Sequence, residues 1–269
     1  MTDPYALASR GDATVEMAGE HVAVVEIHRP PNNHFDVGLI RDLADTYEAL
    51  DGHCRAIVLC SEGKHFCAGA DFTNPSAPSL DAAPGTPFRA SASQLYDEAA
   101  RLFEARTPVV AAVQGAAIGG GLGLACSADF RVTCPEARFS ANFARLGFHQ
   151  GFGLTVTLPS LVGQQGALDL LLTGRRVGGE EALRMGLCDS LVEGGDLRRT
   201  AIDLAGELAA SAPLAVRSIR ATMRDGLVER FREATLHEQQ EQDELRKTED
   251  FVEGVRATAE RRDALFTGR

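Results

Sequence analysis

Two glycine-rich stretches of this chain could direct backbone amides at a single ligand atom. Gly119-Gly120-Gly121 follows an apolar run over residues 109–113, and Ala68-Gly69-Ala70 lies just beyond another apolar run over residues 56–60. Both runs are short enough to be buried strands. If these strands are neighbours, each loop can offer an N–H group to the same oxygen, which would make an oxyanion hole for a thioester carbonyl. The alternative is that the glycines serve only tight turns and close packing of a helix on a sheet.

Several common cofactor motifs are absent from the sequence. Leu124 stands where a dinucleotide-binding fingerprint beginning at Gly119 requires its third glycine. The chain contains neither a P-loop motif nor the G-x-S-x-G turn of serine hydrolases. His237-Glu238 is followed by Glu241 and not by a second histidine, so the zinc-protease pattern fails. We therefore expect no metal and no resident cofactor.

The composition predicts a globular protein. With 269 residues and 44% hydrophobic residues, the chain fits one large domain, or one domain with a small appendage. The net charge of −11 argues against nucleic acid or an anionic membrane surface as a partner. No apolar run reaches the roughly 18 residues that span a bilayer, and residues 1–20 lack the pattern of a secretory signal, so we expect a cytoplasmic protein. The six cysteines form no C-x-x-C pair and are expected to be reduced thiols.

The glycine loops are embedded in an alternation of strands and helices. Asp36 is suited to cap a helix whose apolar residues recur at helical spacing from Val37 to Leu50. A surface loop is expected over residues 73–92, followed by a helix that ends before Thr107-Pro108. Strands are expected over residues 22–27, 56–60, 109–113 and 130–133, with an extended piece over 137–140. This alternation is typical of an α/β fold with parallel crossovers.

From Leu154 onward helical periodicity dominates. The predicted helices cover residues 154–162, 164–172, 180–185, 197–209, 214–223, 227–245 and 248–266. The strongly polar stretch over residues 237–244 is expected to be a solvated helix face. We predict a sheet-containing core over residues 1–195 and a helical C-terminal region over residues 196–269.

Three motifs in order carry a family resemblance. These are Phe66-Cys67-Ala68-Gly69-Ala70-Asp71, the triple glycine, and Leu172-Thr173-Gly174 followed by the segment from Ala182 to Asp189. Together they resemble the crotonase superfamily, the enoyl-CoA hydratases and isomerases, and the resemblance extends over residues 21–266. It implies a spiral of ββα units with a helical C-terminal region that drives trimerisation. It also implies a homotrimer or a dimer of trimers, and an acyl-CoA ligand whose CoA enters with the substrate.

The resemblance also implies site residues. It assigns the two oxyanion-hole N–H groups to Ala70 and Gly120, and it implies that the segment Ala68, Gly69, Ala70 and Asp71 lines the CoA and thioester site. The family often binds the CoA phosphates with basic residues. The candidates here are Arg29, Lys64, Arg261 and Arg262, each of which could instead be an ordinary solvated charge.

The chain departs from the family at two positions. Hydratases of the family carry a glutamate two residues after the triple glycine and a second one twenty residues further on, where this sequence has Gly123 and Phe143. Neither residue can transfer a proton, and the loss of a positioned acid or base typically costs about 10²–10⁴ in rate. His149 is the best substitute, because histidine titrates near neutral pH, although it could equally be structural. Phe143 is expected to make the acyl pocket apolar, together with Phe148 and Phe152.

Two hypotheses about function follow. The first is a CoA-thioester enzyme of altered chemistry, with isomerisation, C–C bond hydrolysis, decarboxylation and slow hydration all open. The second is a non-catalytic protein on the same scaffold that binds or carries acyl-CoA.

Overall fold

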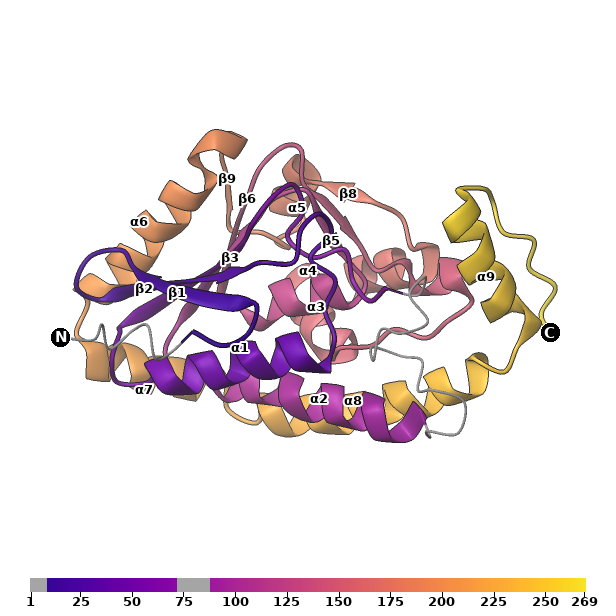
Figure 1. The fold of residues 1–269 in the computed structure, drawn as a ribbon, viewed down its shortest axis with the longest axis horizontal. Helices are drawn as coiled ribbons and strands as arrows, with labels where there is room; N and C mark the ends of the chain where they lie inside the picture. The colour runs from indigo at the N-terminus through magenta and orange to yellow at the C-terminus, as the bar shows by residue number, and fades with distance from the viewer. Residues whose placement is uncertain (1–8, 72–87) are drawn as a thin grey trace.

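Two sheets form the framework of the chain (Figure 1). The structure is a computed structural model that describes residues 9–71 and 88–269. The larger sheet has the strand order β1-β2-β3-β4-β6-β9, and its neighbouring strands are parallel except for β1 and β2. Its strands are Ala13–Met17, Val22–Ile27, Ala56–Ser61, Val109–Val113, Phe130–Thr133 and Ser190–Leu191. The smaller sheet has the order β5-β7-β8, with strands Ala116–Ile118, Arg138–Ser140 and Val177–Gly178.

The central strands are apolar throughout because both faces of the larger sheet are covered. Every residue of β3 and β4 is buried. Along β3, Ile57 and Leu59 face the core that contains α1 (Val37–Leu50), whereas Val58 packs in a second cluster with α6 (Leu197–Ala210). Successive side chains of a strand point to opposite faces, so one apolar run supplies both cores.

The structure tests the predicted helix cap at Asp36 and the end of the predicted loop over residues 73–92. The Asp36 side chain accepts a hydrogen bond from Leu39 N at 2.8 Å, which confirms the predicted cap of α1. The predicted surface loop over residues 73–92 falls largely outside the described residues. Its last part is wrong, because α2 (Phe88–Glu104) already begins at Phe88. The aromatic and alanine residues here continue the helical periodicity, which outweighs the loop-like composition before them.

A short strand, β5, was not predicted from the sequence. It lies between the apolar run over residues 109–113 and the triple glycine. After Gln114-Gly115, the chain enters β5, which pairs with β7 and bridges to the other glycine loop. Cys67 N donates to Ala116 O at 2.9 Å, and Ile118 N donates to Cys67 O at 3.1 Å. These bonds join the two loops directly. Three residues are too few to show the alternation by which a strand is recognised in a sequence.

The middle of the chain supplies short helices around the second sheet. α3 (Gly120–Ser127) begins at the triple glycine, and the 3-10 helix η1 (Asn142–Leu146) follows β7. The predicted helices over residues 154–162 and 164–172 are confirmed as the two parts of α4 (Leu154–Thr173), which meet at a kink at the non-helical Gly163, whose φ is 72°. α5 (Gly179–Arg184) and the 3-10 helix η2 (Gly194–Asp196) precede α6.

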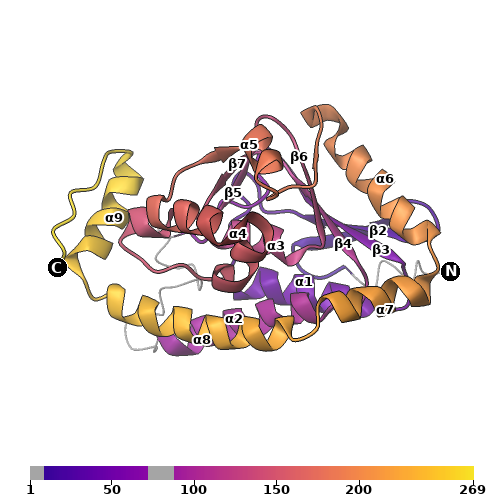
Figure 2. The ribbon, with the colours of Figure 1, turned by 180° about the vertical axis from the view of Figure 1, so that it is seen from behind.

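The C-terminal helices run along the core (Figure 2). α7 (Pro213–Met223) and α8 (Leu227–Leu245) lie end to end, and α8 packs on α2, with the rings of Phe103 and Phe231 4.4 Å apart. α6 shares a hydrophobic cluster with strands of the larger sheet. The predicted boundary between a core over residues 1–195 and a helical region over residues 196–269 stays a prediction. None of the α7 residues is buried, and Leu214 is 81% exposed. Within residues 9–71 and 88–269, every helix is too short or too polar to cross a membrane.

The final helix is shorter than predicted. α9 (Glu249–Glu260) ends at Arg261, which has a left-handed backbone with φ 56°, so the predicted helix over residues 248–266 is wrong beyond residue 260. The Glu253 carboxylate accepts a hydrogen bond from Leu265 N at 3.0 Å. Asp250 likewise accepts from Thr267 N at 2.7 Å. These carboxylates fold the tail back along α9 and compete with further helix formation.

Candidate active site

A cavity of about 320 Å³ lies where the two glycine loops meet η1 and the C-terminal helices. Ala70 and Gly120 both line it, as do Phe143 of η1, Gln242 of α8 and Thr258 of α9. The segment Ala68, Gly69, Ala70 and Asp71, predicted to line a ligand, borders the cavity throughout. The structure therefore brings the two glycine loops to one place.

The contact between the loops depends on glycine. A Cβ at Gly69, where φ is 89°, would lie 2.8 Å from Ile118 O, and a Cβ at Gly121 would overlap the Cys67 carbonyl. Since real Cβ atoms do not approach a carbonyl oxygen so closely, larger residues would push the loops apart. Neither Ala70 N nor Gly120 N donates a hydrogen bond to any residue of the described ranges. Two backbone donors thus border the cavity without an acceptor among residues 9–71 and 88–269.

Aromatic side chains line the cavity. The rings of Phe35 and Phe152 meet edge to face at 5.5 Å, and Phe35 lies so close to Gly120 that a Cβ there would overlap its ring. Phe143 and Phe148 are also buried and line the cavity, as expected from the sequence. In such surroundings a hydrogen bond to a charged oxygen is stronger than in water.

The two positions that depart from the family pattern are both buried. A Cβ at Gly123 would lie 2.6 Å from Cβ of Phe152, so Phe152 occupies the space that a longer side chain at residue 123 would need. Phe143 presents its ring to the cavity. Neither position offers a proton-transfer group.

His149 does not line the cavity. Its Nδ1 lies 2.9 Å from Gln150 O, and its ring meets the His237 ring edge to face at 5.8 Å. A direct acid–base role for His149 would therefore require its loop to move. The titratable side chains that do border the cavity are His34, Asp71 and Tyr96. Burial raises the pKa of Tyr96, whose hydroxyl donates to Gln242 Oε1 at 3.1 Å.

The loop that carries His149 is held by a buried carboxylate that sequence reasoning missed. Glu238 is 0% exposed and accepts hydrogen bonds from Gly153 N at 2.9 Å and Thr155 N at 3.0 Å. Burial raises the pKa of Glu238. The prediction that residues 237–244 form a solvated face is thus wrong at Glu238, Gln239 and Gln242, which are buried. Glu238 and Gln242 share a helix face with the buried Phe231. Their spacing from Phe231 was the signal that could have revealed this.

The four basic candidates lie away from the cavity. Arg29 pairs with Asp12 and Asp36, and Arg262 pairs with Glu253 and Glu260. Lys64 and Arg261 are exposed. Contact of these residues with CoA phosphates stays a prediction. Within the described ranges, no three His, Cys, Asp or Glu side chains are grouped so that they could hold a metal ion.

The comparisons with known proteins agree with the fold. Residues 17–269 match the family model of enoyl-CoA hydratase/isomerase. The chain is 32% identical over 253 residues to a putative enoyl-CoA hydratase/isomerase of Bacillus subtilis, covering 93% of this chain and 95% of that protein. It is also 32% identical over 261 residues to a carnitinyl-CoA dehydratase of Citrobacter koseri, covering 93% of this chain and 97% of that protein. A crystal structure of an enoyl-CoA hydratase/isomerase from Pseudoalteromonas atlantica superimposes with a TM-score of 0.81 at 29% identity, over 96% of this chain and 100% of that one.

Proposed function

This chain belongs to the enoyl-CoA hydratase/isomerase family, and on that premise we propose that it is an enzyme acting on an acyl-CoA thioester. In this proposal the amides of Ala70 and Gly120 stabilise negative charge on the thioester oxygen, as an enolate or a tetrahedral species. The observation that carries the proposal is a pair of backbone donors at one cavity that have no acceptor in the part of the chain that the structure describes. Deleting one such donor typically costs about 2.7–4 kcal/mol of transition-state stabilisation.

The surroundings of the donors favour an apolar acyl group. Phe35, Phe143 and Phe152 would contact the acyl chain, while the CoA portion would leave past residues 68–71. Water has no positioned acid or base at residues 123 and 143, so we propose that hydration is slow. Isomerisation, C–C bond hydrolysis and decarboxylation each form an enolate or a tetrahedral species that these amides would stabilise. Isomerisation also needs a group that removes and returns a proton, hydrolysis consumes one water, and decarboxylation releases CO₂ before the enolate takes up a proton.

One observation favours a second candidate, a non-catalytic acyl-CoA carrier. Phe152 fills the space beside Gly123, and His149 does not line the cavity, so the described residues supply few proton-transfer groups. A protein with this site could hold a thioester without transforming it.

The test is to incubate the full chain with saturated, enoyl, 3-oxo and cyclic acyl-CoA thioesters. Native mass spectrometry detects what stays bound, and chromatography with mass spectrometry detects what is transformed. We expect binding and a new product, whose mass change identifies the reaction. Binding without any product would favour the carrier, and neither binding nor product would overturn both proposals.

We also propose that the chain forms a homotrimer or a dimer of trimers through its helical C-terminal region. The exposed apolar side chains of α7 support this, because Leu214 and Met223 are 81% and 80% exposed in the single chain. Analytical ultracentrifugation would give the assembly's mass, and a monomer at micromolar concentration would contradict the proposal.

A further inference from the structure

We propose that His34 is a positioning residue that orients and polarises the peptide carrying one of the two oxyanion donors. The inference rests on the proposed function, since it concerns the same site. His34 Nδ1 lies 3.0 Å from Gly69 O. A carbonyl oxygen can only accept, so Nδ1 carries the hydrogen and donates it. Phe35 N donates to the same oxygen at 3.2 Å.

The carbonyl of Gly69 and the N–H of Ala70 belong to one peptide unit. Because a peptide is planar and its C=O and N–H point in opposite directions, whatever holds the oxygen also aims the N–H. Here two donors hold the oxygen, and Ala70 lies at the cavity. The side chain of His34 therefore acts on the Ala70 N–H through the Gly69 carbonyl at the other end of the same peptide unit.

The orientation of this peptide must be fixed by hydrogen bonds from other residues. Gly69 has a φ of 89°, in a region that only glycine enters easily, and glycine permits more backbone orientations than any other residue. The hydrogen bonds at Gly69 O select one of these orientations. They also polarise the amide, since a donor at the oxygen makes the N–H more positive, and hydrogen bonds in series strengthen one another.

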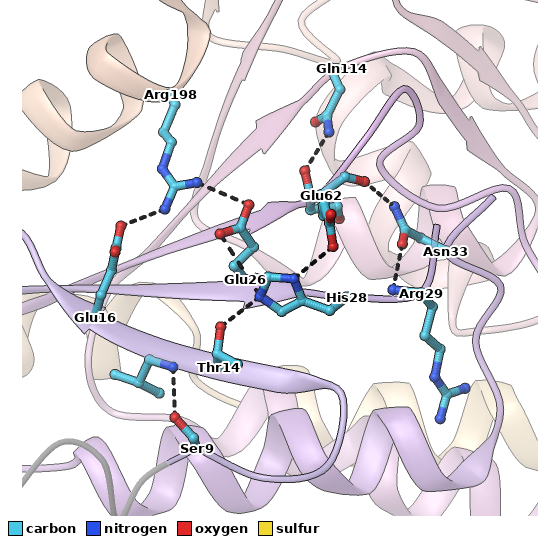
Figure 3. A network of polar contacts seen from close by, with 12 residues as sticks. Ser9, Thr14, Glu16, Glu26, His28, Arg29, Asn33, Glu62, Gln114 and Arg198 are labelled. Carbon is cyan, nitrogen blue, oxygen red and sulfur yellow. Dashed lines mark hydrogen bonds and ion pairs between the residues drawn. The ribbon is translucent and has the colours of Figure 1, made fainter. Parts of the chain in front are cut away.

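The residue before His34 is fixed by its own hydrogen bonds. Asn33 is 0% exposed and has a left-handed backbone with φ 49°. Its Nδ2 donates to Glu62 O at 2.9 Å, and its Oδ1 accepts from Arg29 N at 2.9 Å (Figure 3). Nδ2 also donates to His65 O at 2.6 Å. These bonds fasten the segment before α1 to the loop after β3. The imidazole is thus presented to Gly69 by a rigid support, as a positioning role requires.

Three substitutions separate this role from others. Asn carries an amide nitrogen near the place of Nδ1, so His34→Asn retains the donor, whereas Gln extends the amide beyond it and Leu has no donor. We expect His34→Leu and His34→Gln to lower kcat about tenfold, the effect of one neutral hydrogen bond, with little change in KM. His34→Asn should keep kcat within about threefold of the wild-type value, since it restores a bond of similar strength. Thermal unfolding of each variant controls for loss of fold.

A second readout requires no turnover. The full chain is mixed with 4-(dimethylamino)cinnamoyl-CoA, a conjugated thioester whose absorption moves to longer wavelength when its carbonyl is polarised. We expect the wild type and His34→Asn to shift the absorption, and His34→Leu to shift it less at saturating probe.

The outcomes distinguish the two proposals. A wild type that does not bind the probe or shift its absorption would overturn the proposed function and the role of His34 with it. A normal shift in His34→Leu, or a His34→Asn variant as impaired as His34→Leu, would overturn the role of His34 alone. An impaired His34→Asn variant would mean that Nε2 of His34, which asparagine does not replace, carries the function.

Discussion

Phe152 lies against the Cα of Gly123, so that a Cβ at residue 123 would come within 2.6 Å of Cβ of Phe152. Phe152 itself has a left-handed backbone with φ 60° and is almost fully buried. The two residues lie on α3 and on the loop before α4, and their contact excludes a side chain from the position where the family resemblance implies a glutamate. Several properties of the site depend on this contact.

Gly123→Ala should lower the free energy of unfolding by about 1–3 kcal/mol, because its methyl group would overpack the contact with Phe152. Gly206→Ala on α6 is the matched control. A Cβ at Gly206 meets nothing within 4 Å, so alanine should instead stabilise the helix by about 0.5–1 kcal/mol. Chemical denaturation of both variants measures the difference. Equal stability of the two variants would show that the site at Gly123 relaxes freely.

Phe152→Ala should cost about 3–5 kcal/mol of unfolding free energy, the usual cost of emptying a buried aromatic site. Phe152→Gly loses the same ring, but glycine adopts the left-handed backbone of residue 152 without strain. Alanine in that backbone conformation is disfavoured by about 1–2 kcal/mol. We therefore expect the glycine variant to unfold at a similar or higher denaturant concentration than the alanine variant. A markedly less stable glycine variant would mean that the backbone at residue 152 carries no strain.

Gly120→Ala should reduce kcat/KM on any thioester that the wild type transforms by about 10²–10³, the cost of displacing one oxyanion donor. The added methyl overlaps the Phe35 ring, so the start of α3 must shift. Gly178→Ala, where a Cβ meets nothing within 4 Å, is the control and should retain activity. Steady-state kinetics on the two variants would decide, and full activity of Gly120→Ala would remove Gly120 from the oxyanion hole.

Glu238 should make stability depend on pH in a defined direction. Burial raises its pKa in the folded chain above the ordinary value of 4.5, so the folded state binds the proton more tightly than the unfolded state. This contribution to stability is fully present below pH 4.5 and is lost as the pH rises through the folded-state pKa. Unfolding measured across this window should show the loss in the wild type and not in Glu238→Gln. Glu241→Gln, on the exposed side of α8, should follow the wild type.

Asp129→Ala should destabilise the chain by about 3–5 kcal/mol, because it leaves two largely buried arginines without their carboxylate. Asp129 accepts from Arg220 Nε and from an Arg224 nitrogen, each at 2.8 Å, and also from Val109 N at 2.8 Å. Burial disfavours the charged form of Arg224 and so lowers its pKa. The Asp129 carboxylate offsets this penalty, and its removal would leave the buried charge uncompensated. Asp196→Ala breaks an exposed pair with Arg199 and should change stability by less than about 1 kcal/mol. Similar denaturation midpoints for both variants would contradict this account of how α7 is held.

The sequence by itself determined the central strands, most of the helices and the two glycine loops. The strand over residues 22–27, the cap at Asp36 and the helix that follows it depend on patterns within a few residues, and the structure confirms each of them. The motifs around Ala70 and the triple glycine were enough to indicate the family. The weakest local patterns failed, as at the three residues of β5 and at the end of α9.

Only the tertiary structure decided what surrounds the two glycine loops. Glu238 lies 85 residues from Gly153 in the chain and His34 lies 35 residues from Gly69, so no local pattern joins either pair. The polar sequence around Glu238 resembles that of a solvated helix, and burial became apparent only when α8 was packed against the loop before α4. Phe152 likewise fills the space beside Gly123 because the loop before α4 packs against α3. Periodicity and capping act through neighbours in sequence, whereas the shape, dryness and hydrogen bonding of a cavity depend on contacts between segments that only the folded chain brings together.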